Sequence, residues 1–291
     1  MTSIRTTVGD VTLVADVYGP PDGPPALLFH GGGQTRHSWK GAAATLGERG
    51  WYAASYDLRG HGESDWSPDG LYGTHVFGDD VRHLALAQSR PPALVGASLG
   101  GIASLLAIAA ADEADRERVA AALVLVDVAP RLETAGVTKI GLFMRSGLDG
   151  FDSLDDVADA IAAYNPNRPR PTDLSGLRKN VRQRADGKWV WHWDPRFLQP
   201  RTIDGLSVDE ASYSHERRLA DAARKVTCPT LLVRGRESDV LSEDGARNLL
   251  SLIPHAEYVD VSGAGHMVAG DRNDWFSDAV VEFLQRVLPP R

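Results

Sequence analysis

Residues 93–101 of the chain read Ala-Leu-Val-Gly-Ala-Ser-Leu-Gly-Gly, and this stretch decides the fold. An apolar run enters a turn of small residues, and the helix-forming stretch Ile102–Ala111 follows. Ser98 lies in the turn, within the Gly-x-Ser-x-Gly pattern of a nucleophile elbow, in which a sharp strand-to-helix turn presents a serine hydroxyl above a sheet. Such a turn is strained and brings backbones close together, so its neighbours must be small. We therefore predict that Ser98 is a nucleophile.

Short apolar runs alternate with helical stretches on both sides of this turn. The runs predict strands at 26–29, 51–56, 120–126, 229–233 and 257–261, and the helical stretches are 38–49, 74–88, 243–252 and 275–287. Thr74 and Ser242 are the expected helix caps. Two further strands, 4–8 and 11–18, predict an antiparallel hairpin at the edge of the sheet. Continuous apolar strands alternating with helices indicate an α/β fold with a mostly parallel, doubly covered sheet.

The rhythm of strands and helices breaks between residues 131 and 224. This region is rich in Asp, Arg and Pro and has no strong strand run. We expect a core made of residues 1–130 and 225–291, with residues 131–224 inserted after the sixth strand as a mainly helical lid. Trp189, Trp191 and Trp193 alternate, so in an extended segment they share one face. That stripe either packs the lid onto the core or lines the substrate cleft.

Composition narrows the classes of partner. The chain has 291 residues and a net charge of −8, with 43% hydrophobic and 24% charged residues. These values are ordinary for a globular protein, and the negative charge argues against a nucleic-acid or anionic-membrane surface as the main partner. Cys228 is the single cysteine, which excludes an internal disulfide, and we expect it to be a small buried residue.

The first residues and the apolar runs predict neither a signal peptide nor a membrane span. No apolar region follows the first five residues, so no signal peptide is expected. The weakly polar run 93–111 is long enough for a membrane span but contains Gly96, Ser98 and Ser104, which fit a buried strand, turn and helix better. We expect a cytoplasmic monomer or homodimer that binds a small-molecule substrate and needs no cofactor or metal.

Several chemically active residues follow predicted strands. His30-Gly31-Gly32-Gly33 comes after the first parallel strand, and His266 lies in a glycine-containing loop after the last one. The stretch 30–33 lacks both Gly-x-Gly-x-x-Gly and Gly-Lys-Ser/Thr, which argues against a nucleotide site. An oxyanion hole needs two backbone N–H groups. We expect these groups to be those of Leu99, at a helix N-terminus, and Gly32.

Together these residues resemble the α/β-hydrolase superfamily, in its branch of lidded esterases, perhydrolases, C–C hydrolases and epoxide hydrolases. The resemblance covers 1–130 and 225–291 and rests on these motifs: His30-Gly31-Gly32-Gly33, Asp57-x-Arg59-Gly60-His61-Gly62-x-Ser64, Gly96-x-Ser98-x-Gly100-Gly101, Ser238-Asp239 and Gly265-His266. Epoxide hydrolases and haloalkane dehalogenases carry Asp at the elbow, so Ser98 argues against both chemistries. Perhydrolase-like members usually have a bulky residue where Gly32 stands.

The resemblance implies a triad in the chain order Ser, acid, His. Ser98 is then the nucleophile and His266 the base, held by a carboxylate. Asp239, after the penultimate strand, is the expected acid, and Asp127, after an earlier strand, is the alternative. His61, like the histidines at 37 and 75, is expected to be a loop or helix-start residue without a catalytic role.

The expected function is a serine hydrolase that cleaves a carboxylic ester of a small or medium apolar acid through an acyl-enzyme. C–C bond hydrolysis, peracid chemistry and acyl transfer are alternatives on the same fold. Non-catalytic ligand receptors with an intact triad also have this fold, so a binding protein is a candidate of a different class. Turnover of simple esters separates the enzyme from the receptor.

Overall fold

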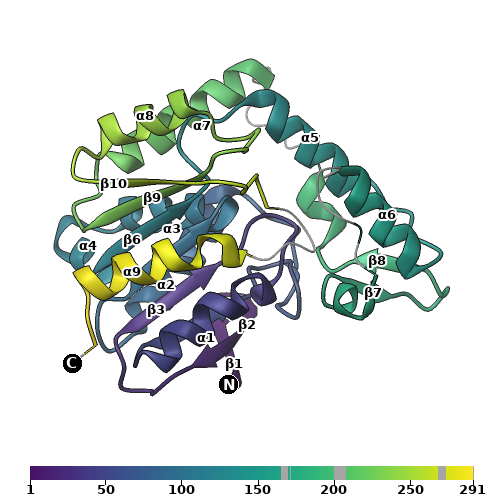
Figure 1. Cartoon of the computed structure of the whole chain (residues 1–291), viewed down its shortest axis with the longest axis horizontal. Helices are drawn as coiled ribbons and strands as arrows, with labels where there is room; N and C mark the ends of the chain where they lie inside the picture. The colour runs from purple at the N-terminus through teal and green to yellow at the C-terminus, as the bar shows by residue number, and fades with distance from the viewer. Residues whose placement is uncertain (165–169, 171, 200–207, 268–272, 291) are drawn as a thin grey trace.

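A computed structural model of the chain shows one large sheet with helices packed on both of its faces (Figure 1). The structure describes residues 1–164, 170, 172–199, 208–267 and 273–290. In this part of the chain the sheet has eight strands in the order β1-β2-β4-β3-β5-β6-β9-β10. The strands are β1 (Thr2–Val8), β2 (Val11–Tyr18), β3 (Pro25–Phe29), β4 (Tyr52–Tyr56), β5 (Ala93–Ala97), β6 (Ala122–Val126), β9 (Thr230–Gly235) and β10 (Glu257–Val261).

The strands from β4 to β10 in the sheet are all parallel, and β2 joins them antiparallel to both β1 and β4. The prediction of a mostly parallel sheet is confirmed. The hairpin forms as expected, but only β1 lies at the edge, since β2 also pairs with β4. In the register Ala97 pairs with Val126, and Val126 pairs with Val233. The residues that follow these three positions therefore emerge side by side at the carboxyl edge of the sheet.

Both faces of the sheet are buried because its central strands are apolar at every position. In β3, Leu27 and Phe29 face one hydrophobic cluster and Leu28 faces the other. The helices α1 (Lys40–Glu48) and α9 (Ser277–Val287) cover the Leu28 side, with the short 3-10 helices η1 (Arg36–Trp39) and η4 (Asn273–Phe276). The opposite side is covered by α2 (Thr74–Leu86), α3 (Leu99–Ala110), α4 (Glu113–Val119), α7 (Val208–Ala223) and α8 (Glu243–Leu252).

The helix ends differ in one detail from the predicted caps. Ser242 caps α8 through its side chain, which accepts a hydrogen bond from the N–H of Gly245, as expected. The cap of α2 is Gly73, and its neighbour Thr74 is already helical. The Thr74 hydroxyl instead accepts a hydrogen bond from Arg218 of α7 at 2.9 Å. The Thr74 hydroxyl, which the local sequence predicted to cap α2, is therefore engaged by a residue of the distant helix α7.

The described residues between 131 and 198, called the insert below, lie beside the carboxyl edge of the sheet (Figure 1). The helix α7, at the end of the expected lid, instead packs into the core cluster on one face of the sheet. Up to residue 198 the insert contains α5 (Thr134–Arg145), α6 (Leu154–Tyr164), η2 (Ser175–Lys179), β7 (Val181–Gln183), β8 (Trp189–Trp191) and η3 (Pro195–Leu198). A third hydrophobic cluster fills this part, and Trp191 and Trp193 are buried in it with their rings stacked 4.8 Å apart. The insert thus has its own small core, which includes a two-stranded ribbon that the sequence did not reveal.

Buried polar contacts fix the end of the insert to the main sheet. Asp194 is 1% exposed and accepts a hydrogen bond from the Tyr72 hydroxyl at 2.6 Å. Its own N–H donates to the carbonyl of Gly60 at 2.8 Å. Arg196 pairs with the Asp194 carboxylate and also donates to the carbonyl of Ser67. Paired and buried in this way, Asp194 joins the insert to the loop between β4 and α2.

Candidate active site

Ser98 stands at the elbow between β5 and α3 in a conformation that non-glycine residues rarely adopt, with φ 46° and ψ −113°. A Cβ on Gly96 would lie 2.4 Å from the backbone of Gly100, and one on Gly100 would lie 2.4 Å from the carbonyl oxygen of Phe29. The glycines thus allow β5, α3 and β3 to approach closely around the serine. Strained backbone of this kind is concentrated at functional sites. The elbow has the geometry that its motif predicts.

Asp127 is the only other non-glycine residue in the described part of the chain with positive φ, at 51°. It follows β6, immediately beside Ser98, whose N–H donates to the carbonyl of Val126 at 3.1 Å. The Asp127 carboxylate is 3% exposed and accepts hydrogen bonds from the Gly235 N–H at 3.1 Å and the Ser238 hydroxyl at 2.7 Å. These donors hold the carboxylate in one orientation and stabilise its charge.

His266 is the third partner of this carboxylate. Its Nδ1 lies 2.6 Å from Oδ2 of Asp127, and both side chains are 4% exposed. A carboxylate at Nδ1 places the proton there and leaves Nε2 free to accept a proton from another group. The arrangement therefore provides an oriented, buried base at the same edge of the sheet as Ser98.

The expectation that Asp239 holds His266 is wrong. The Asp239 side chain is 44% exposed and pairs with Lys139 of the insert, with Oδ2 and Nζ 2.9 Å apart. Its backbone carbonyl lies against Gly136, where an added Cβ would approach it to 2.1 Å. The loop after β9 therefore contributes Ser238 to the site and turns Asp239 outward toward α5. The carboxylate at His266 belongs to Asp127, the alternative that the sequence left open.

The loop that carries His266 is held against the end of β9. The N–H of Glu237 donates to the carbonyl of Ala264 at 3.0 Å, and the N–H of Arg236 donates to Val261 at 2.9 Å. Gly263 has φ +74°, which accounts for a glycine at that position. Anchored in this way, the imidazole keeps its place beside Asp127.

The glycine loop after β3 offers three successive backbone N–H groups, and two of them have side-chain partners. The N–H of Gly31 donates to Oε1 of Gln34 at 2.9 Å, and the N–H of Gly33 donates to Nε2 of His61 at 3.1 Å. Among the described residues the N–H of Gly32 has no partner. The same holds for Leu99 at the start of α3, whereas its neighbour Gly100 donates to the carbonyl of His30. The free donors are thus the two that were predicted.

Two buried histidines support this loop in a neutral state. Nδ1 of His30 lies 2.7 Å from the carbonyl of Gly31, and its Nε2 accepts the N–H of Leu58 at 3.0 Å. His61 contacts the carbonyl of Arg59 through Nδ1 and accepts from Gly33 through Nε2. Burial lowers the pKa of His30 to about 4 and that of His61 to about 3. Each ring therefore stays an acceptor at Nε2 near neutral pH.

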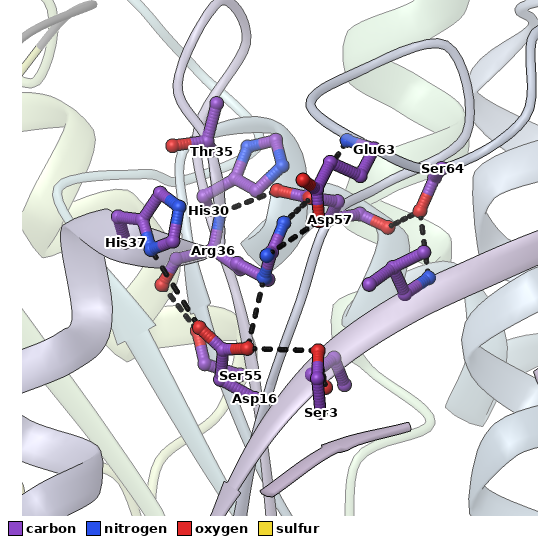
Figure 2. A network of polar contacts seen from close by, with 12 residues as sticks. Ser3, Asp16, His30, Thr35, Arg36, His37, Ser55, Asp57, Glu63 and Ser64 are labelled. Carbon is purple, nitrogen blue, oxygen red and sulfur yellow. Dashed lines mark hydrogen bonds and ion pairs between the residues drawn. The ribbon is translucent and has the colours of Figure 1, made fainter. Parts of the chain in front are cut away.

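A buried charged network lies behind the loop (Figure 2). The Asp57 carboxylate accepts hydrogen bonds from the backbone N–H and the guanidinium of Arg36, which also faces Asp16 and Glu63. Burial works against the Arg36 charge, but the adjacent Asp57 carboxylate holds the pKa of Arg36 above its usual range. The network fixes the chain on both sides of the site, namely the segment after the glycine loop and the segment that contains His61.

These histidines predict an acid sensitivity of the fold. In the unfolded chain His30 and His61 both titrate near pH 6.5. As the pH falls below 6.5, the unfolded state therefore binds protons that the folded state does not bind. We expect the free energy of unfolding to fall between pH 6.5 and 4, by on the order of 3 kcal/mol for each ring. Urea unfolding at pH 7.5 and 4.5, followed by tryptophan fluorescence, measures this loss.

The control is a His61→Gln variant, since glutamine can donate to the carbonyl of Arg59 and accept from Gly33 but does not titrate. It should lose about half of the pH dependence. A wild-type urea midpoint that is the same at both pH values, or an unchanged loss in His61→Gln, contradicts the prediction.

The side of the glycine loop that faces the insert is apolar. A Cβ on Gly32 would meet the ring of Phe197 at 3.8 Å and the sulfur of Met144 at 4.0 Å. A Cβ on Gly33 would meet Met144 at 3.1 Å and the Trp193 ring at 3.3 Å. Of the predicted tryptophan stripe, Trp193 therefore reaches the glycine loop. The free N–H of Gly32 lies at the boundary between the sheet and these apolar insert residues.

Sequence reasoning missed the contribution of His61, which holds the glycine loop although it was assigned no role. The available signal was the pair of flanking glycines. Gly60 and Gly62 both have positive φ, and a Cβ on Gly62 would lie 2.2 Å from the Asp57 carboxylate. Such spacing indicates a loop shaped around a buried group. It does not reveal which distant N–H the ring will accept.

The described residues contain neither a metal-binding cluster nor a membrane-spanning helix. No group of three or more His, Cys, Asp or Glu side chains there is arranged to hold a metal ion. No helix within the same ranges has both the length and the apolar character to cross a bilayer. Cys228 is half-buried, and burial raises the pKa of its thiol to about 11.

The chain is similar in sequence and in fold to known hydrolases. A model of the alpha/beta hydrolase family matches residues 26–279. Esterase Rv0045c of Mycobacterium tuberculosis is 29% identical over 92% of this chain and 84% of its own. The 2-(acetamidomethylene)succinate hydrolase of Mesorhizobium japonicum is 30% identical over 91% of this chain and 89% of its own. A crystal structure of E-2-(acetamidomethylene)succinate hydrolase shares the fold, with a TM-score of 0.79 at 24% identity over 99% of this chain and 98% of that one.

Proposed function

The chain belongs to the alpha/beta hydrolase family and is a hydrolase, and from this premise we propose that it is a serine esterase acting on esters of small or medium apolar acids. The observation that carries the proposal is the 2.6 Å contact between His266 and Asp127, beside the strained elbow of Ser98. A serine hydroxyl is a weak nucleophile until a base takes its proton. An oriented histidine at the same sheet edge is the group suited to that task.

In the proposed reaction Ser98 attacks the ester carbonyl while Nε2 of His266 takes its proton. His266 then returns the proton to the leaving alcohol, and water, activated by the same imidazole, hydrolyses the acyl-enzyme. Asp127, not Asp239, is the acid of the triad. It fixes the tautomer of His266 and stabilises the imidazolium that forms. Each proton is thereby taken up and released by one residue.

The oxyanion of the tetrahedral intermediate is proposed to bind the free N–H groups of Gly32 and Leu99. Both belong to backbone that is already held in place, so the donors need not reorganise when charge develops. The Leu99 N–H also lies at the N-terminus of α3, a helix of 12 residues whose dipole favours negative charge. This preorganisation supports acyl transfer over simple binding.

An apolar acyl group is supported by the residues opposite the glycine loop. Phe197, Met144 and Trp193 bring no charge to this place. The relative named for 2-(acetamidomethylene)succinate acts on a molecule with carboxylate groups. None of these three side chains, which lie nearest to Gly32 and Gly33, offers a cation for such a group. We therefore propose an ester of a monocarboxylic acid and assign the insert the role of a lid over it.

The test is a panel of p-nitrophenyl esters from acetate to octanoate, compared with the p-nitrophenyl half ester of succinate. We expect kcat/KM to rise with acyl chain length to butyrate or beyond and to be at least tenfold lower for the succinate half ester. One added methylene in an apolar pocket contributes roughly 1 kcal/mol, whereas an unpaired carboxylate loses its hydration. Steady-state kinetics with pre-steady-state burst detection measures both the preference and the acyl-enzyme.

Two results contradict the proposal in different ways. Stoichiometric labelling of Ser98 by a fluorophosphonate without turnover of any ester favours a ligand receptor. Equal or faster turnover of the succinate half ester leaves the esterase assignment intact but overturns the apolar acid. Asp239→Asn serves as the matched control, since its carboxylate is exposed and should leave the preference unchanged.

A further inference from the structure

Gln34 lies directly after the glycine loop, and its buried side chain bonds to two segments that are far apart in the sequence. The side chain is 1% exposed. Oε1 accepts the N–H of Gly31 at 2.9 Å, and Nε2 donates to Oδ1 of Asn273 at 3.3 Å. Asn273 is fully buried at the start of η4, the helix that follows the His266 loop along the chain. The amide of Gln34 thus joins the glycine loop to η4, which follows the proposed base His266 along the chain.

The glycine loop needs such an external contact because its own residues do not fix its conformation. Three successive glycines have little backbone preference, so their peptide planes can rotate at low cost. The Gly31 carbonyl, which shares its peptide plane with the Gly32 N–H, contacts Nδ1 of His30, and two side chains restrict the neighbouring N–H groups. Gln34 holds the N–H of Gly31 from one side, and His61 holds the N–H of Gly33 from the other. The middle N–H, that of Gly32, is then the one left to face the substrate.

The Gln34 contact acts close to the nucleophile. A Cβ on Gly31 would lie 3.2 Å from Oε1 of Gln34 and 3.4 Å from Cβ of Ser98. The backbone N–H of Gln34 also donates to the carbonyl of Gly31 at 3.1 Å and closes the turn. The Gln34 side chain holds the His30–Gly31 peptide, and its backbone N–H holds the Gly31–Gly32 peptide, which carries the Gly32 N–H. The two peptides meet at the Gly31 Cα, so a rotation of the first shifts the second beside the serine, where a misplacement of about 1 Å is costly.

We propose that Gln34 is a positioning residue that sets the direction of the Gly32 N–H and couples it, through Asn273, to the segment behind His266. This inference rests on the proposed function. Gln34 touches neither reacting atom in this scheme. Its loss should weaken stabilisation of the transition state and leave binding of the ground-state ester nearly unchanged.

The first test is Gln34→Met, which keeps the length of the side chain and removes the side-chain hydrogen bonds to Gly31 and Asn273. We expect kcat to fall by roughly 30-fold to 300-fold, with KM within threefold of the wild-type value. This is less than the ~10²-fold to 10³-fold cost of losing one oxyanion donor, because the Gly32 N–H is displaced and not removed. The affinity of a boronic acid transition-state analogue should fall by the same factor as kcat/KM. A purely structural role predicts instead a lower melting temperature with kcat per folded enzyme unchanged.

The second test is Gln34→Glu, read from the pH profile. Protonated glutamic acid has the shape of glutamine, accepts from Gly31 and donates to Asn273, whereas its carboxylate opposes charge on the nearby oxyanion. Burial of this position should raise the pKa of the introduced carboxyl well above its usual value. The ratio of kcat for Gln34→Glu to wild type should therefore be at least one third at pH 6 and decline toward pH 9. If Gln34→Glu is as impaired as Gln34→Met at pH 6, positioning by these bonds is contradicted.

Two controls separate this inference from the proposed function. Thr230→Val removes an equally buried hydroxyl at the opposite end of β9 and should alter stability alone. Ser98→Ala reports on the function itself. If Ser98→Ala is inactive and Gln34→Met keeps wild-type kcat, the inference fails and the proposed function stands. If Ser98→Ala keeps its activity, the proposed function fails, and the inference about Gln34 fails as well.

Discussion

Replacement of Asp127 by asparagine is expected to lower kcat/KM by about 10⁴-fold, as is found when the acid of a serine triad is made neutral. The geometry gives the reason. The Asn oxygen can still accept the N–H of Gly235, and its amide NH₂ group then faces the Ser238 hydroxyl and Nδ1 of His266. Nδ1 must then accept a hydrogen bond, which moves the imidazole proton to Nε2. In that tautomer His266 cannot take the proton of Ser98.

The matched control for this prediction is Asp239→Asn, which tests the residue that the sequence favoured. Its carboxylate is exposed and pairs with Lys139, and such surface pairs contribute about 0–1 kcal/mol. We expect its kcat/KM to stay within threefold of wild type. Steady-state kinetics on p-nitrophenyl butyrate, with melting temperatures recorded for both variants, makes the comparison. Full activity of Asp127→Asn together with an inactive Asp239→Asn would restore the original assignment.

Ser98→Ala is expected to lower kcat by 10⁵-fold to 10⁶-fold, since removal of the nucleophile abolishes the covalent route and leaves only binding and the oxyanion donors. The elbow φ of 46° disfavours any L residue, so the variant retains the strain but loses the hydroxyl. Ester hydrolysis at substrate saturation, followed over hours, measures the residual rate. Circular dichroism and the melting temperature show whether the fold survives.

A residual rate within 100-fold of wild type in a folded Ser98→Ala enzyme contradicts the assignment of Ser98. Ser98→Gly differs from Ser98→Ala because it relieves the backbone strain as well as removing the hydroxyl. A Ser98→Gly variant that is more stable than wild type and equally inactive would show that the elbow holds strain for function.

The sequence predicted most of the sheet because its central strands are continuously apolar and its turns carry glycine. β10 (Glu257–Val261) matches its predicted bounds, and the elbow at Ser98 forms as its small neighbours indicate. The helix α4 was missed, since its seven residues, Glu113–Val119, are largely charged and bury only Val119. Periodicity reports burial on one face, so a short exposed helix leaves no such pattern.

The choice between Asp127 and Asp239 could not be made from local sequence. Both follow apolar strands, and both are near the carboxyl edge. What separates them is the register of β6 with β9 and the packing of Gly136 against the Asp239 backbone, which turns that side chain outward. These are contacts between residues distant in sequence. The positions of Ser98 and His266 were easier to predict because local glycine patterns mark both.

The same limit applies to the supports of the glycine loop. From the sequence we predict Gly32 as an oxyanion donor, but the sequence does not show that Gln34 and His61 take up the neighbouring N–H groups. A glutamine or a histidine in a polar loop has many possible partners. The partner is decided only when the loop between β4 and α2 folds against the loop after β3.

The central claim is that Ser98 forms an acyl-enzyme with the base His266 held by Asp127, and intact-mass spectrometry of the enzyme quenched with acid during ester turnover tests it most directly. We expect one acyl adduct per chain, mapped by peptide analysis to Ser98, that is absent from Ser98→Ala and forms far more slowly in Asp127→Asn. An adduct on another residue, or rapid ester turnover by Ser98→Ala, would contradict it.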